Sequence, residues 1–252
     1  MRHNISYRLG MENKISGLHH VTAIAGPAQE NLDFYAGVLG MRLVKKSVNQ
    51  DDPTTYHLFY ADGEGHPGTD LTFFPWAQMA PSRRGYGLST EVSLAVPPGS
   101  LAFWSTRLEH YGAKIFSPET RFGQNVLPLA DAHGLRVALV ESEDSLGRPF
   151  SPWEQSPVPV QHQIRGLECA RMAERDLALT VAFLSDAMGF RHLGSENGWE
   201  RYGVGEGKSG EYLDLRSVPE ESRGDWVNGS IKKPPSLWGD EADQLTGGRR
   251  VL

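Results

Sequence analysis

The sequence contains two copies of one motif, and this internal repeat constrains the fold more than any other feature. Residues 17–42 (GLHHVTAIAGPAQENLDFYAGVLGMR) align without a gap with residues 166–191 (GLECARMAERDLALTVAFLSDAMGFR). Further along, residues 60–74 align with residues 202–216, after a connection that is shorter in the second copy. Two segments that recur in the same order indicate a duplicated structural unit whose loops differ in length.

Each copy has the pattern of a βαβββ unit. In the first copy a short strand (18–24) leads through a Gly-Pro turn to a helix, in which apolar residues recur at helical spacing between positions 32 and 39. Gly40 is the expected C-cap of that helix. The turn residues that follow, Asp-Gly and Pro-Gly, separate three further strands. These strands are expected at 42–47, 56–61 and 69–74.

The repeat also predicts how the rest of the chain is divided. A weaker unit of the same kind fills the space between the copies, with strands at 92–96, 126–129 and 135–140 and a helical apolar stripe from Leu101 to Tyr111. The chain is therefore predicted to be an α+β protein of tandem βαβββ modules. We expect a first domain at 15–144 (modules 1 and 2), a Ser/Pro-rich linker at 145–161 and a second domain at 162–252. A fourth module should begin near Gly229, and only its first strand and helix fit before Leu252, so we expect it to be incomplete.

Composition and charge exclude several classes of function. The net charge of −6 and the pI near 5.8 argue against a nucleic-acid surface, which needs a clustered basic face. The sequence has no apolar stretch long enough for a signal peptide or a membrane span, so no membrane partner is expected. Its one cysteine, Cys169, excludes an internal disulfide and fits a reducing compartment. We expect a cytoplasmic protein. The sequence is compatible with a homo-oligomer and leaves the oligomeric state open.

The pair His19-His20 is the strongest candidate for a functional group. Imidazole is the commonest transition-metal ligand in proteins, and a strand end on an open sheet is a suitable platform for one. A structural role is the simpler interpretation of an isolated histidine pair. Side chains alternate across a strand, so the two rings are expected on opposite faces, with one as ligand and the other in packing or support.

The region that contains this pair resembles a known family. Residues 17–76, together with TRFGQ (120–124), SPWEQSPVPVQHQIRG (151–166) and DEADQL (240–245), are similar to ring-cleaving, hydroquinone-type extradiol dioxygenases. These belong to the glyoxalase/bleomycin-resistance/dioxygenase superfamily, whose vicinal-oxygen-chelate fold consists of βαβββ modules. The resemblance covers about residues 15 to 250 and implies an enzyme that opens a hydroquinone- or catechol-type ring with O2.

The resemblance also implies a set of site residues. Family members hold Fe(II), or Mn(II) in some cases, with two histidines and one carboxylate that leave positions open for the aromatic diol and O2. The first ligand maps to His20, and His19 and Thr22 map to active-site positions beside it. The second ligand would be a histidine where this chain has Lys233, and the third would be a glutamate later in the fourth module. Lysine is a protonated point charge at neutral pH and a poor metal donor.

With two of three ligands missing, the sequence leaves three interpretations open. The first is a ring-cleaving dioxygenase whose activity is impaired in the chain as written. The second is a non-catalytic, truncated relative of the same fold that binds small aromatic molecules, and a weaker third is a glyoxalase- or thiol-transferase-like enzyme. Glu168 and Cys169 occupy the positions of His19 and His20 in the second copy, where the family binds no metal, and the remaining histidines are interpreted as structural.

Overall fold

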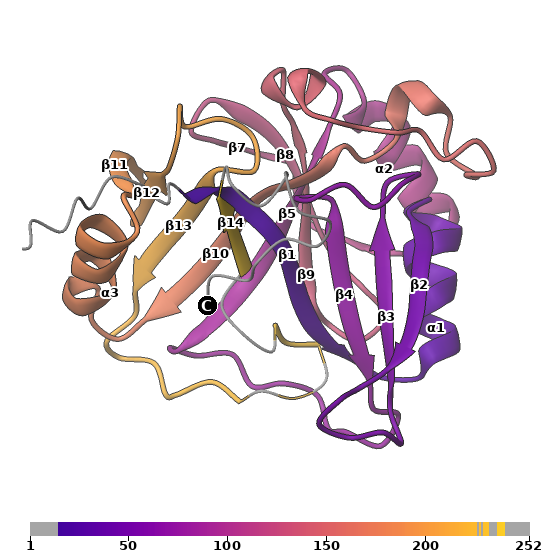
Figure 1. Cartoon of the computed structure of the whole chain (residues 1–252), viewed down its shortest axis with the longest axis horizontal. Helices are drawn as coiled ribbons and strands as arrows, with labels where there is room; N and C mark the ends of the chain where they lie inside the picture. Colours follow the sequence, from indigo (N-terminus) through magenta and orange to yellow (C-terminus); the bar gives the residue numbers. More distant parts are fainter. Residues whose placement is uncertain (1–14, 226, 228, 232–235, 240–252) are drawn as a thin grey trace, which may run out of the picture.

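The computed structural model describes residues 15–225, 227, 229–231 and 236–239, and two β-sheets lie at the centre of this part of the chain (Figure 1). The five-stranded sheet has the order β14 (Ser236–Gly239), β1 (Ile15–Ala25), β4 (Asp70–Pro75), β3 (Tyr56–Ala61) and β2 (Arg42–Val48). The nine-stranded sheet has the order β11 (Arg191–Glu196), β12 (Trp199–Gly203), β13 (Tyr212–Ser217), β10 (Gly166–Glu174), β5 (Leu88–Val96), β9 (Arg136–Glu141), β8 (Gln124–Ala130) and β6 (Lys114–Ile115), with β7 (Glu119–Arg121) paired to β8.

The first and third units have the same topology, which confirms the predicted duplication. In the first unit β1 pairs in parallel with β4, and β4, β3 and β2 continue as antiparallel neighbours. In the third unit β10 pairs in parallel with β13, followed by antiparallel β12 and β11. The strands predicted at 42–47, 56–61 and 69–74 are found as β2, β3 and β4. The middle unit repeats the pattern, since β5 pairs in parallel with β9 and then β8 and β6 follow.

The two sheets group the units in a way that the order along the chain does not suggest. An antiparallel pair of β5 and β10 joins the second and third units into one continuous sheet, whereas β14 pairs antiparallel with β1 of the first unit. The last described strand therefore extends the first unit rather than the third. The division into domains 15–144 and 162–252 stays a prediction, and the hydrogen-bonded sheets cross it.

The helices contain a shared irregularity that the sequence analysis did not anticipate. In the first unit an α-helical turn, α1 (Ala28–Leu32), continues as a π-helix over Asp33–Val38, and in the third unit α3 (Ala178–Ala182) continues as a π-helix over Phe183–Ala187. The wider π turn recurs at the same place in both copies, so it is a property of the unit. Gly40 ends the first helix with φ +70°, as its predicted C-cap role requires.

The hydrophobic core lies between the sheets and their helices. The helix of the middle unit, α2 (Leu101–His110), lies beside the first helix, and Arg107 reaches from it to the carbonyl oxygens of Gly37 and Val38 (Figure 1). A buried hydrogen bond joins the same two units, because the hydroxyl of Tyr35 donates to a carboxylate oxygen of Asp131 at 3.0 Å. The remaining connections include two short 3₁₀ turns, at Asp144–Gly147 and Val160–His162.

We predict that Tyr35→Phe lowers the free energy of unfolding by about 1–3 kcal/mol, because it removes a fully buried hydroxyl from a buried carboxylate. Urea denaturation followed by circular dichroism measures this difference. Tyr111→Phe is the control, since the Tyr111 side chain is 49% exposed and should change stability little. Equal losses in the two variants would show that the bond between Tyr35 and Asp131 does not stabilise the contact between the units.

Candidate functional site

A bulge in β1 brings both histidines of the predicted site to one face of the five-stranded sheet. Leu18 and Val21 both belong to the hydrophobic core, although residues on one face of a regular strand are two positions apart. The register with β14 shifts between Leu18 and His20, and this extra residue carries His19 and His20 away from the core together. Their Nδ1 atoms lie 3.0 Å apart and their rings meet at 83°. The expectation that the rings lie on opposite faces is therefore wrong.

Thr22 lies on the same face, and the parallel neighbour β4 supplies the next row of side chains. His20 is paired in register with Asp70, and Thr22 with Thr72, whose hydroxyl donates to the Thr22 hydroxyl at 2.9 Å. Burial raises the pKa of Asp70 to about 7, and the charge of Asp62 adds to this rise. One carboxylate oxygen of Asp70 is buried without a hydrogen-bond partner. The face therefore combines imidazole, hydroxyl and a carboxyl group that titrates near neutral pH.

Aromatic side chains from β3 and β4 complete this face, which we call the site face. The ring of His57 lies 4.0 Å from that of Phe59 and 4.1 Å from that of Phe74, measured between centroids. Lys45 places its ammonium group 5.2 Å from the centre of the Phe59 ring. Apolar ring surfaces beside hydrogen-bond donors are the combination that a hydroxylated aromatic molecule needs.

The segment expected to open the fourth module runs beside β1. The amide of Ile24 donates to the carbonyl of Ser230 at 2.8 Å, Ala23 forms a β-bridge with Ile231, and His20 is in register with Ser236. Positions 232–235, which include the Lys233 that replaces an expected histidine, lie outside the described residues. The expected place of the second ligand, at position 233 beside His20, therefore stays a prediction.

The described residues do not by themselves form a complete metal centre. A ferrous site of the type that the family resemblance implies needs two imidazoles and a carboxylate around one point. In the described part of the chain, no three His, Cys, Asp or Glu side chains are placed to hold one metal ion. The Nδ1 atoms of His19 and His20 face each other at hydrogen-bond distance. The arrangement therefore offers a partial donor set that does not fit a bound iron as it stands.

The corresponding face of the nine-stranded sheet is filled by buried charges that pair with one another. Asp214 accepts hydrogen bonds from Arg201 at 2.8 and 3.1 Å and from Arg171 at 3.3 Å. Glu91 and Arg121 form a second buried pair at 2.5 Å. Paired charges of this kind hold a fixed structure, and removal of one partner leaves the other buried and uncompensated.

Glu168 and Cys169 occupy the positions of the histidine pair in this second face. A bulge recurs here, since Leu167 and Ala170 both lie in the core and the register with β5 shifts between Leu167 and Cys169. Burial raises the pKa of Glu168, whose carboxylate accepts from Gln124 at 2.7 Å and also from Ser209. These contacts show a structural carboxyl group where the first copy has its candidate site.

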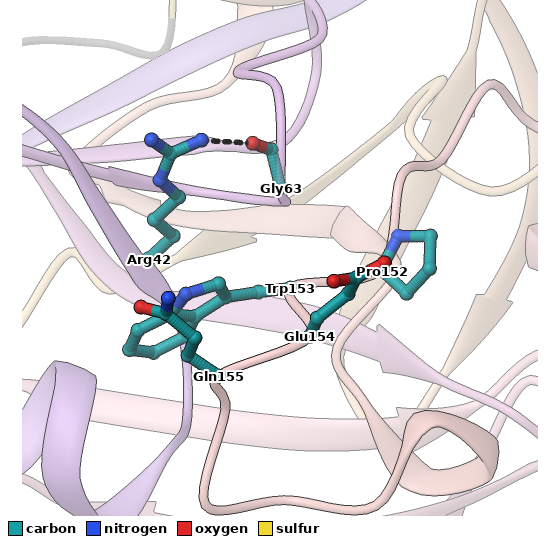
Figure 2. Close-up of a pocket in the computed structure, with 6 residues that line it drawn as sticks. All are labelled: Arg42, Gly63, Pro152, Trp153, Glu154 and Gln155. Carbon is teal, nitrogen blue, oxygen red and sulfur yellow. Dashed lines mark hydrogen bonds between the residues drawn. The ribbon is translucent and has the colours of Figure 1, made fainter.

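A separate hollow lies where β2 begins, against the linker (Figure 2). It has a volume of about 270 Å³ and is lined by Arg42, Gly63, Pro152, Trp153, Glu154 and Gln155. Arg42 donates a hydrogen bond to the carbonyl of Gly63 across its upper side. None of the predicted site residues lines this hollow, so it is distinct from the site face.

His57, which the sequence pattern assigned to a structural role with the other scattered histidines, lies on the site face. The alternation of β3 contained the necessary signal, because Leu58 and Tyr60 are core residues and therefore place His57 and Phe59 on the opposite face. Four other histidines make local contacts, namely His66 with Asp62, His133 with Glu30, His162 with Ser100 and His192 with Glu200.

The fold and the repeated units agree with comparisons to known proteins. Residues 17–139 match the model of the Glyoxalase/Bleomycin resistance protein/Dioxygenase superfamily. The chain is 38% identical over 241 residues to a Bacillus subtilis protein named "Putative ring-cleaving dioxygenase MhqO", covering 96% of this chain and 75% of that protein. The chain belongs to this superfamily.

Three further comparisons extend this result. The chain is 30% identical over 222 residues to the "Chlorohydroquinone/hydroquinone 1,2-dioxygenase" of Sphingobium indicum, covering 87% of this chain and 68% of that protein. A crystal structure from Bacillus subtilis, titled "putative dioxygenase", superposes with a TM-score of 0.77 at 38% identity and covers 87% of this chain and 69% of its own. Maize glyoxalase I, at 16% identity and a TM-score of 0.62 over 84% of this chain and 72% of its own, shares the fold.

The described helices are all too short or too polar to cross a bilayer.

We predict that the stability of the wild-type protein falls relative to Glu168→Gln as pH rises above about 4.5. The raised pKa means that the folded state binds this proton more tightly than the unfolded state, so stability decreases between the ordinary value of 4.5 and the folded pKa. Glutamine keeps the acceptor without a charge. Urea denaturation over a pH series measures the effect, and Glu154→Gln, at an exposed glutamate, is the control. Parallel pH curves for wild type and Glu168→Gln would contradict the assignment.

Proposed function

We propose that this protein descends from ring-cleaving dioxygenases and has an impaired form of their activity, with its substrate site on the site face and a hydroquinone- or catechol-type diol as substrate together with O2. The proposal is supported by relatives named as ring-cleaving and hydroquinone dioxygenases, which match the chain over 87–96% of its length. The observation that carries it is the bulge in β1, because it gathers His19, His20 and Thr22 on one face with aromatic side chains. A cytoplasmic location remains part of the proposal.

The proposal assigns binding and orientation to the side chains of the site face. Aromatic surface from Phe59 and Phe74 suits the ring of a diol, and the hydroxyl of Thr22 suits its oxygen atoms. The resemblance assigns His20 as a metal ligand for Fe(II) or Mn(II), the ion that would pass electrons from the diol to O2 in such enzymes. Because the described donor set does not complete such a site, we derive no step of the reaction through a metal.

A second candidate function is supported by the residue types at positions 232 and 233. The family resemblance expects a histidine pair there, and this chain has Lys232 and Lys233, which do not bind iron as neutral donors. A protein with this replacement can keep the aromatic site face and bind a small aromatic molecule without opening its ring. Consumption of O2 distinguishes the two candidate functions, whereas both predict that the protein binds a diol.

We predict that the chain as written binds Fe(II) weakly and does not consume O2 with hydroquinone at the rate of the Bacillus relative. An expected ligand is replaced by lysine, and even changes next to metal ligands typically cost about 10–100-fold in affinity or activity. An oxygen electrode, with anaerobically added Fe(II) and with the Bacillus protein measured beside it, provides the test. Equal rates would establish catalysis and rule out the second candidate.

We predict that Lys232→His/Lys233→His raises Fe(II) affinity without producing ring opening, because a carboxylate ligand is still lacking. Adding His20→Ala to this double variant should remove the gain, by about 10-fold or more. Equilibrium dialysis with metal analysis measures the affinity, and His192→Ala in the same background is a control at an exposed histidine on β11, the edge strand of the other sheet. If His20→Ala leaves the gained affinity unchanged, the assignment of His20 as a ligand is wrong.

A further inference from the structure

His57 occupies a fixed position on the site face between two aromatic rings. Its ring is inclined at 37° to that of Phe59 and at 29° to that of Phe74, with centroids 4.0 and 4.1 Å away. Contacts on both sides restrict the rotation of the imidazole and direct its Nε2 atom along the sheet. That atom lies 3.1 Å from the hydroxyl of Thr72, a residue with no exposed surface.

A chain of hydrogen bonds leads from His57 to a predicted site residue. Thr72 donates its hydroxyl hydrogen to the hydroxyl oxygen of Thr22 at 2.9 Å. A threonine hydroxyl has one hydrogen, so Thr72 can only accept in its contact with His57. The Nε2 atom of His57 must therefore carry a proton and donate it to Thr72.

The direction of donation along these hydrogen bonds determines whether Thr22 donates to a ligand or accepts from it. Its oxygen already accepts from Thr72, so its own hydrogen is directed to a different acceptor. None of the described residues accepts that hydrogen. A half-buried hydroxyl with this polarity, beside His19 and His20, is suited to donate to a ligand oxygen that carries negative charge, such as a phenolate.

We propose that His57 is a positioning residue that holds Thr22, through Thr72, as a hydrogen-bond donor on the site face. The identity of the ligand as an aromatic diol rests on the proposed function, whereas the hydrogen-bond chain does not. A histidine with only a packing role would need its ring between Phe59 and Phe74 but no particular protonated nitrogen. The protonation of Nε2 therefore distinguishes positioning from packing.

The first experiment tests the hydrogen bonds from His57 to Thr72 and Thr22 in the ligand-free protein. Nuclear magnetic resonance of ¹⁵N-labelled histidine rings, assigned with His57→Gln, should show a protonated Nε2 on His57 whose hydrogen exchanges slowly with water. Thr72→Val removes the acceptor and should make that hydrogen exchange too fast to observe, while circular dichroism shows an intact fold. An unprotonated Nε2 in the wild-type protein, or slow exchange that persists in Thr72→Val, would overturn the proposal.

The second experiment measures binding of 4-nitrocatechol, a coloured diol whose absorption reports ionisation. Thr22→Val should weaken binding by about 10-fold or more, the effect of losing one hydrogen bond to a charged group, and Thr22→Ser should retain affinity. His57→Phe keeps an aromatic ring between Phe59 and Phe74 and should weaken binding in the same direction. His57→Gln keeps an N–H donor and should restore part of the loss.

A double variant tests whether His57 acts through Thr22. Thr22→Val/His57→Phe should bind no more weakly than Thr22→Val alone, because the Thr22 hydroxyl through which His57 would act is already absent. Additive losses would overturn the proposal. His162→Phe is the matched control, since His162 also stacks on an aromatic ring, Phe103, and contacts a hydroxyl, that of Ser100, away from the site face.

The two experiments separate this inference from the proposed function. If the wild-type protein does not bind 4-nitrocatechol while His57 shows a protonated, slowly exchanging Nε2, the ligand class is wrong and the positioning role stands. If 4-nitrocatechol binds and Thr22→Val weakens it, but His57→Phe and His162→Phe bind equally well, the site stands and the role of His57 is refuted.

Discussion

The extra residue in β1 is the constraint on which the candidate site depends. A regular strand would direct one histidine into the core beside Leu18 and Val21, where an imidazole would lose its hydration without a suitable partner. The bulge keeps both apolar residues in the core and turns both histidines to the site face. The same irregularity occurs in β10, between Leu167 and Ala170. It therefore belongs to the duplicated unit, and each copy uses the two residues in a different way.

The two faces show how one backbone supports different chemistry. On the nine-stranded sheet the two positions hold Glu168 and Cys169, and the surrounding arginines and carboxylates form buried pairs with one another. Such a face is held together by charge pairing, and a ligand would have to compete with interactions that are already made. On the five-stranded sheet the same positions hold His19 and His20, beside hydroxyl groups and aromatic rings. On this face the described polar groups include imidazoles and hydroxyls, in place of the paired arginines and carboxylates of the other sheet.

Most of the fold could be predicted from the sequence, because local patterns specify it. The apolar periodicity, the turn residues and the recurrence of both segments correctly placed β2, β3 and β4 and identified Gly40 as a helix end. The pairing of β14 with β1 and of β5 with β10 could not be predicted, since contacts between distant strands leave no local pattern. The residues of the candidate site stay a prediction. The expected geometry of the histidine pair was wrong, because a bulge depends on the neighbouring strand as well as on the sequence of the strand itself.

The role of His57 illustrates why a scattered histidine is hard to interpret before the sheet is known. Its nearest relevant partners are Phe74 and Thr72, which lie on the next strand and are distant in sequence. Only the register of β4 with β1 connects Thr72 to Thr22 and thereby links an imidazole on β3 to a hydroxyl on β1. Each hydroxyl has a single hydrogen, so the protonated Nε2 of His57 sets the direction of donation in both hydrogen bonds, from His57 to Thr72 and from Thr72 to Thr22. A change at His57 can therefore reverse what Thr22 offers to a ligand without moving any atom of the strand that carries it.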